Sequence, residues 1–191
     1  PAGSQAFTKT VYDSLGRAVK QYLGHDADET AVSSSSSSSS SAGGAPTPFP
    51  SPGTYADATS VTGDTIVEQV ETVYDDAGNV LMSVTRQRFH NATGTGELTS
   101  PSGSQPKARV SYVCLWHDSV GRQKAVANYG TNGGSTLSRP STVPTRSDTI
   151  LVTSTEYNSA GQAYKTIDPA GREDRQEFDA AGRVVKTIQN Y

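Results

Sequence analysis

The side chains best suited to chemistry in this sequence are histidines, one cysteine and many aspartates and serines. The three histidines, His25, His90 and His117, are scattered without the spacing of metal ligands. His25 opens an acidic cluster at 25–29 that could hold a calcium ion loosely, but the cluster lacks the glycine and closing glutamate of a calcium-binding loop. A solvated charge run is the simpler interpretation, so we predict no metal site.

The nucleophilic side chains give no catalytic pattern. Cys114 is the only cysteine, so the chain can form no internal disulfide. It lies in the apolar stretch 110–116 and is best interpreted as a small buried side chain; a catalytic thiol or an intermolecular bridge is the alternative. Serines abound, but none lies in a Gly-x-Ser-x-Gly elbow. We predict that the chain is not an enzyme and takes no cofactor.

One combination of residues does recur at fixed spacing, and its role is to set the backbone conformation. Six segments share an aromatic or apolar residue, then Asp or Asn, two variable residues, glycine and often arginine. The predicted turn residues are Tyr12, Asp13, Gly16, Arg17, Tyr74, Asp75, Gly78, Asp118, Gly121, Arg122, Tyr157, Asn158, Gly161, Asp168, Gly171, Arg172, Phe178, Asp179, Gly182 and Arg183. A basic residue also recurs four places after the glycine, at Lys20, Lys165, Arg175 and Lys186.

This pattern predicts a tight β-hairpin turn. An aspartate at the first turn position can accept hydrogen bonds from backbone amides two residues on. A glycine three residues later supplies the positive φ of a type I turn followed by a bulge. Pro169 falls at the second turn position of its copy, where its fixed φ is compatible with the turn. Each copy should therefore join two antiparallel strands.

The flanking segments have the composition of strands. Those before the turns, at 7–12, 65–74, 109–117 and 149–157, are rich in Thr, Val, Ile and Tyr. Those after the turns lie at 18–23, 80–89, 124–129 and 184–188. In 109–117, the residues Val110, Tyr112, Cys114 and Trp116 fall on one face at period two. The sequence therefore predicts an all-β fold of antiparallel hairpin repeats.

The first turns are separated by inserts, whereas the last three repeats follow almost without a break. We divide the chain into a first hairpin at 1–24, a Ser/Pro/Gly-rich insert at 25–63 with nine consecutive serines, and a hairpin array at 64–191. Smaller inserts interrupt the array near 91–105 and 130–146. We expect all three inserts to be loops on the outer surface, because a buried loop would leave backbone polar groups unpaired.

Composition narrows the possible partners. Only 33% of the residues are hydrophobic and 18% are charged, with a net charge of −3, which gives no basic surface for nucleic acid. No apolar run is long enough to cross a bilayer. We expect neither nucleic-acid binding nor a membrane span.

The six copies resemble the YD repeat of the rearrangement-hotspot (RHS) family, which includes bacterial RHS-repeat proteins, the shells of insecticidal toxin complexes and the teneurin adhesion receptors. The resemblance covers most of the chain outside the inserts. The departures from the Tyr-Asp-x-x-Gly-Arg pattern are His117 for tyrosine, Asn158 for aspartate, and Asn79 and Gln162 for arginine.

The resemblance implies hairpins coiled into a hollow shell or an extracellular scaffold, and six units are too few to close such a shell. We expect a structural scaffold segment, extracellular or at the cell surface, whose open strand edges pair with copies of itself or with flanking repeats of a longer chain. A fragment of a shell that encapsulates a toxin cargo is the alternative. In toxin shells an Asp-Pro-x-Gly element lies near a self-cleavage site; here Asp168 and Pro169 are interpreted as an ordinary turn.

A third class of function is a carbohydrate-binding adhesion module. Trp116 and the nine tyrosines could stack on sugar rings of surface glycans, although at this spacing beside the turns such residues more often pack within the sheet. Asn91 begins a glycosylation sequon, and the serine tract could carry O-linked sugar in a cell that performs such modification.

Overall fold

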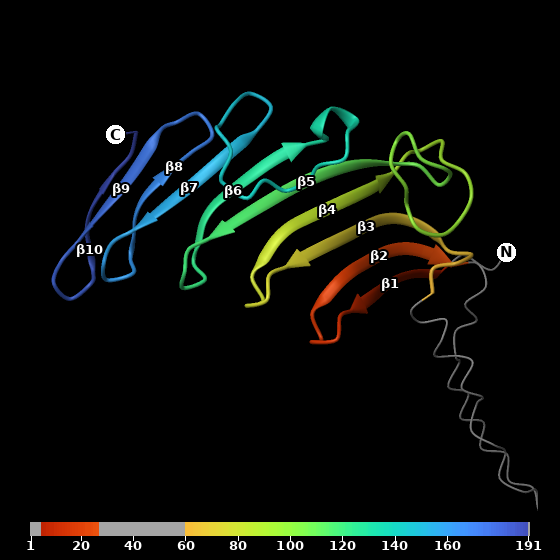
Figure 1. The fold of residues 1–191 in the computed structure, drawn as a ribbon, viewed down its shortest axis with the longest axis horizontal. Coiled ribbons are helices and arrows are strands. Elements are labelled where there is room, and N and C mark those ends of the chain that lie inside the picture. Colours follow the sequence, from red (N-terminus) through yellow and green to blue (C-terminus); the bar gives the residue numbers. More distant parts are fainter. Residues whose placement is uncertain (1–4, 27–59, 191) are drawn as a thin grey trace, which may run out of the picture.

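The computed structural model describes residues 5–26 and 60–190, which form one antiparallel sheet of ten strands (Figure 1). The strands are β1 (Gln5–Tyr12), β2 (Ala18–Asp26), β3 (Thr65–Tyr74), β4 (Val80–Arg88), β5 (Ala108–His117), β6 (Gln123–Gly130), β7 (Leu151–Tyr157), β8 (Ala163–Ile167), β9 (Glu173–Phe178) and β10 (Val184–Ile188). A short 3-10 turn, η1 (Asn132–Gly134), is the one helical element within the described ranges. The predicted all-β fold of antiparallel hairpins is confirmed.

The order of the strands in the sheet is their order in the chain, so successive connections alternate between the two ends of the strands. The turns β1–β2, β3–β4, β5–β6, β7–β8 and β9–β10 lie along the lower side of the sheet in Figure 1; we call them the turn row. The β4–β5 and β6–β7 inserts and the sixth tight turn, between β8 and β9, lie along the opposite side, the loop side. The alternation therefore separates regular turns from variable loops.

One face of the sheet carries the core. In β5 every second side chain is buried, beginning with Ala108 and ending with Trp116. Strand register brings Tyr22, Gln69 and Val110 onto the same face, because each lies in one cross-strand row. We call this side the core face; it holds two buried clusters, one centred on Cys114 and Trp116 and the other on Tyr22 and Ile66.

Two of the inserts lie against the core face, which corrects the expectation that they point outward as surface loops. Leu98 of the β4–β5 loop is 3% exposed, and Leu137 and Val143 of the β6–β7 loop pack against the larger cluster. The expected loss of backbone hydrogen bonds is avoided because the sheet supplies partners. The amide of Leu98 donates to Oε1 of the buried Gln69 at 2.9 Å.

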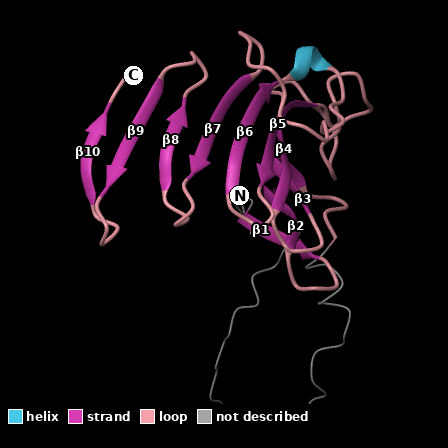
Figure 2. Cartoon of the chain, turned by 60° about the vertical axis from the view of Figure 1, so that its left-hand side comes forward, coloured by secondary structure: helices cyan, strands magenta, loops and turns pink. Residues whose placement is uncertain are grey.

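Beyond β7 the sheet is a single layer. Val152 is the last buried side chain among the described residues, and β8, β9 and β10 contain none. Figure 2 shows these three strands extending away from the loops and η1, which gather over the other part of the sheet. A second layer therefore covers only part of the sheet.

The insert predicted at 25–63 begins too early. His25 and Asp26 belong to β2, where they pair with Ala6 and Gln5 of β1. The rest of the predicted acidic cluster, and the nine serines, lie outside the described residues. The strand continues to Asp26 because β1 and β3 still supply pairing partners there: His25 pairs with both Ala6 and Thr65.

Candidate functional site

All six predicted turns share one backbone geometry. In the first, the amide of Asp13 donates to the carbonyl of Arg17 at 2.9 Å, and the amide of Gly16 donates to the carbonyl of Asp13 at 3.0 Å. The same two bonds recur in the turns that begin at Asp75, Asp118, Asn158, Asp168 and Asp179. The six turn glycines have φ between 76° and 88°, which explains the need for glycine at that position.

The turn aspartate also holds the residue that follows the glycine. Asp13 Oδ1 accepts from the amide of Arg17 at 2.9 Å, and Oδ2 accepts from its Nε at 2.7 Å. Asp118, Asp168 and Asp179 bind their arginines, Arg122, Arg172 and Arg183, in the same way. The backbone hydrogen bond from Arg17, with its guanidinium alongside, lowers the pKa of Asp13. The five turns that begin with aspartate are therefore closed by a carboxylate of lowered pKa, whereas Asn158 accepts the equivalent backbone hydrogen bond from Gln162 with its amide oxygen.

Neighbouring turns in the row are joined by an arginine and a tyrosine. The Arg17 guanidinium lies over the Tyr74 ring, 4.8 Å from its centroid, and donates from Nη1 to the carbonyl of Asp75 at 2.8 Å. In return the Tyr74 hydroxyl donates to the carbonyl of Ala18 at 3.0 Å. The repeat motif thus forms contacts between hairpins as well as closing each one.

A second junction repeats this arrangement. The Arg122 guanidinium lies 4.3 Å from the centroid of the Tyr157 ring, and the Tyr157 hydroxyl donates to the carbonyl of Gln123 at 2.9 Å. In both junctions the acceptor is the residue two places after the turn glycine. The same motif position therefore plays the same role in distant repeats.

The departures from the motif occur in pairs across a junction. Asn79 follows the glycine of its turn, and the next hairpin has His117 in place of tyrosine. Gln162 likewise precedes a hairpin that carries Phe178, and its Nε2 donates to the carbonyl of Gly182 at 3.2 Å. Arginine therefore faces tyrosine at two junctions, and neither residue is present at the other two.

The sixth turn, which begins at Asp168, lies on the loop side, away from the turn row. Its Arg172 pairs with Asp168 at 2.6 Å and its side chain is 65% exposed. It adopts the same turn hydrogen bonds as the others. The motif thus forms the turn in either position, but only the turn row provides a neighbouring tyrosine.

Beyond β7, charge replaces apolar packing on the core face. Lys165 lies 2.6 Å from Glu156 on β7 and 3.6 Å from Glu173 on β9. Arg175 contacts Glu173 at 2.7 Å. The hydrogen bond between Lys165 and Glu156 raises the pKa of the lysine and lowers that of the glutamate. These strands are therefore linked by a network of ion pairs in which two carboxylates offset the like charges of Lys165 and Arg175.

Sequence reasoning missed a buried ion pair that joins β1 to the start of β3. Lys9 Nζ lies 2.9 Å from Asp64 Oδ2 and donates to the carbonyl of Ser60 at 3.0 Å; the two charged side chains are 5% and 4% exposed. Nearby on β2, Gly24 allows close strand packing, since an added Cβ would lie 2.7 Å from the carbonyl oxygen of Thr65. Nothing in the local pattern of β1 marks Lys9 as buried.

A polar network beside it ties the β4–β5 loop to the sheet. The Tyr22 hydroxyl donates to Glu97 at 2.6 Å, and Lys20 lies 2.9 Å from the same carboxylate. Burial, together with the Glu97 carboxylate, raises the pKa of Tyr22. This network positions the loop, and its residues are far apart in sequence.

The other candidate residues are placed for packing. Cys114 is fully buried, which raises the pKa of its thiol and makes it a poor nucleophile. Trp116 is 4% exposed, with the Arg139 guanidinium 4.8 Å from its ring centroid. It therefore lacks the free ring face that stacking on a sugar requires. Across 5–26 and 60–190, no three His, Cys, Asp or Glu side chains gather as metal ligands.

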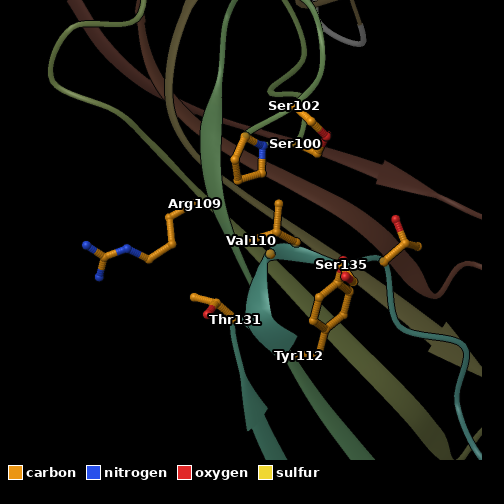
Figure 3. Close-up of a pocket in the computed structure, with 10 residues that line it drawn as sticks. Ser100, Ser102, Arg109, Val110, Tyr112, Thr131 and Ser135 are labelled. Atoms are coloured by element: carbon orange, nitrogen blue, oxygen red, sulfur yellow. The ribbon is translucent and has the colours of Figure 1, made fainter.

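A hollow of about 320 Å³ lies between the two inserts on the core face, beside Val110 and Tyr112 (Figure 3). Ser100, Ser102 and Ser135 line it, whereas the Arg109 side chain points away in the figure. The hollow thus offers hydroxyl groups and part of an aromatic ring. It brings together no acid, base or nucleophile that would define a catalytic site.

No model of a known protein family matches the chain, and no curated protein matches it either. Within the described residues there is no helix of the length and apolar character needed to cross a bilayer.

Proposed function

We propose that this chain is a segment of a structural YD-repeat scaffold, extracellular or at the cell surface, which acts through its shape and the edges of its sheet. The observation that carries the proposal is the row of five turns, in which consecutive hairpins are joined by repeated contacts along an open sheet. Such a sheet presents two edge strands, β1 and β10, whose outer backbone groups are available for pairing. The resemblance to RHS repeats supports the same function.

Electron microscopy of the native material, with light scattering of the isolated chain, tests this proposal. Fibres or tubes whose repeat equals one copy of the chain are expected. A monodisperse monomer at all concentrations would refute the part of the proposal that rests on self-assembly. Protease accessibility on intact cells tests the location.

Replacement of Ile188 by proline provides a specific test, because proline in β10 should block pairing at that edge. The matched control is Ser14→Pro, which places proline at the turn position that Pro169 occupies in the sixth turn. Ile188→Pro should abolish assembly and Ser14→Pro should retain it. Equal assembly by both variants would count against edge pairing through β10.

The second candidate function is a shell that encloses a cargo, which the bend of the sheet in Figure 1 favours. Closed capsules in the micrographs, or a longer parent chain with a variable C-terminal domain, would support that function over a fibre.

A further inference from the structure

One register joins consecutive hairpins throughout the sheet. At every junction the residue four places after a turn glycine pairs with the residue three places before the aromatic position of the next hairpin. The pairs are Lys20 with Glu71, Met82 with Cys114, Ala125 with Ser154, and Lys165 with Arg175. The inserts do not disturb this register, although they differ widely in length. The constant register places the turns of successive hairpins next to one another along one side of the sheet.

The first and last hairpins of the turn row each carry one of the two residues that form such a junction. Arg183 follows the last turn glycine, and its side chain is 79% exposed. Within the described residues it pairs with Asp179 and stacks on no ring. Tyr12 on β1 is 61% exposed, and among the residues that the structure describes no arginine stacks on its ring. The unused residues are thus an arginine and a tyrosine, the combination found at two of the four internal junctions.

We propose that β10 of one copy pairs antiparallel with β1 of a second copy, so that the sheet and its turn row continue head to tail. This inference rests on the proposed scaffold function and identifies its partner. Arg183 lies over Tyr12 of the second copy, whose hydroxyl donates to the carbonyl of Val184, two places after the turn glycine. The contact repeats the one that Arg17 and Tyr74 make within the chain.

The constant register fixes the other cross-strand pairs of this junction. Thr187 lies opposite Thr8 and Ile188 opposite Phe7, a hydroxyl pair and an apolar pair of the kind that stabilises antiparallel strands. Strand direction also agrees, because β10 and β1 run in opposite senses along the meander. The proposed junction therefore needs no change of geometry from those already present.

The same register places Lys186 opposite Lys9, which brings two like charges together. The β8–β9 junction shows how the sheet tolerates such a pair. There Lys165 lies opposite Arg175; Lys165 pairs with Glu156 on the flanking strand β7, and Arg175 pairs with Glu173 on its own strand. Lys186 lies 3.1 Å from Glu177, and Lys9 lies 2.9 Å from Asp64, so each lysine already has its carboxylate.

The test uses sedimentation velocity of the full chain carrying Tyr12→Ala or Arg183→Ala. Each variant should weaken self-association about tenfold or more, because it removes a stacking contact and a hydrogen bond from every junction. Arg172→Ala is the matched control: its arginine closes an identical turn on the loop side but faces no tyrosine. This control should assemble like the unaltered chain.

A mixture of the two variants tests whether β10 of one copy pairs with β1 of another. Arg183 of the Tyr12→Ala chain and Tyr12 of the Arg183→Ala chain can form one intact junction. The mixture should therefore give 1:1 dimers that do not extend further. Assembly that both variants leave unchanged would overturn this junction while leaving the scaffold function intact. A chain that stays monomeric in every form would overturn this junction together with the self-assembly part of the scaffold function. Loss of assembly in Arg172→Ala would show that turn closure, not Arg183–Tyr12 stacking, is responsible.

Discussion

Lys9→Met should destabilise the chain strongly, because it leaves a carboxylate buried without its counter-ion. The two partners lie 2.9 Å apart and are 5% and 4% exposed, so water cannot replace the ammonium group at Asp64. The Ser60 carbonyl loses a donor at the same time. Breaking a buried pair by removing one partner costs about 3–5 kcal/mol in free energy of unfolding. The loss should loosen the start of β3 in particular.

Urea denaturation of dilute, monomeric chain, followed by tryptophan fluorescence, measures this cost. The double variant Lys9→Met with Asp64→Leu should recover much of the loss, because it removes both buried charges together. Lys186→Met is the matched control, since its pair with Glu177 is more than half exposed and should contribute little. A loss below about 1 kcal/mol in Lys9→Met, or a double variant less stable than the single one, would refute the reasoning.

Three further predictions concern the turn row and the sheet. A double-mutant cycle between Arg122 and Tyr157 should give a coupling of about 0.5–1 kcal/mol, and no coupling would show that the stacked geometry adds nothing. Gly24→Ala should lower the free energy of unfolding by about 1–3 kcal/mol, because its Cβ would meet the Thr65 carbonyl oxygen at 2.7 Å; an unchanged urea midpoint would contradict this. The pKa of turn aspartates such as Asp13 is lower in the folded chain than in the unfolded chain. Their contribution to the free energy of unfolding is therefore complete above the unfolded-state pKa of about 4, and it is lost as pH falls through the lower folded-state pKa. The melting temperature should therefore hold near neutral pH and drop below about pH 4, and a flat profile there would refute the assignment.

Much of this fold could be predicted from local sequence. The spacing between Asp13 and Gly16 recurs in five other turns and determines where the chain reverses. The first position needs a side-chain hydrogen-bond acceptor, and the second needs a positive φ. The alternation from Val110 to Trp116 indicates which face of β5 is buried. Both signals act over a few residues and need no knowledge of distant partners.

The paired departures from the motif could have been predicted only in part. The residues Asn79 and His117, or Gln162 and Phe178, are visible in the sequence, and comparing each post-glycine residue with the next aromatic would have revealed the pairing. What was missing was the knowledge that these positions touch. That knowledge depends on the constant register between hairpins.

Only the tertiary structure decided the rest. The inserts predicted near 91–105 and 130–146 were expected on the outer surface, yet residues of both pack against the core face, where partners such as Gln69 satisfy their backbone. Lys9 is a buried ion-pair residue because Asp64, which immediately precedes β3 and is 55 residues away in sequence, lies beside it in the fold. The sequence by itself determined the turns and strands, whose causes are local. The layer over the sheet, the buried charges and the contacts between turns depended on which distant segments met, and no local pattern encodes that.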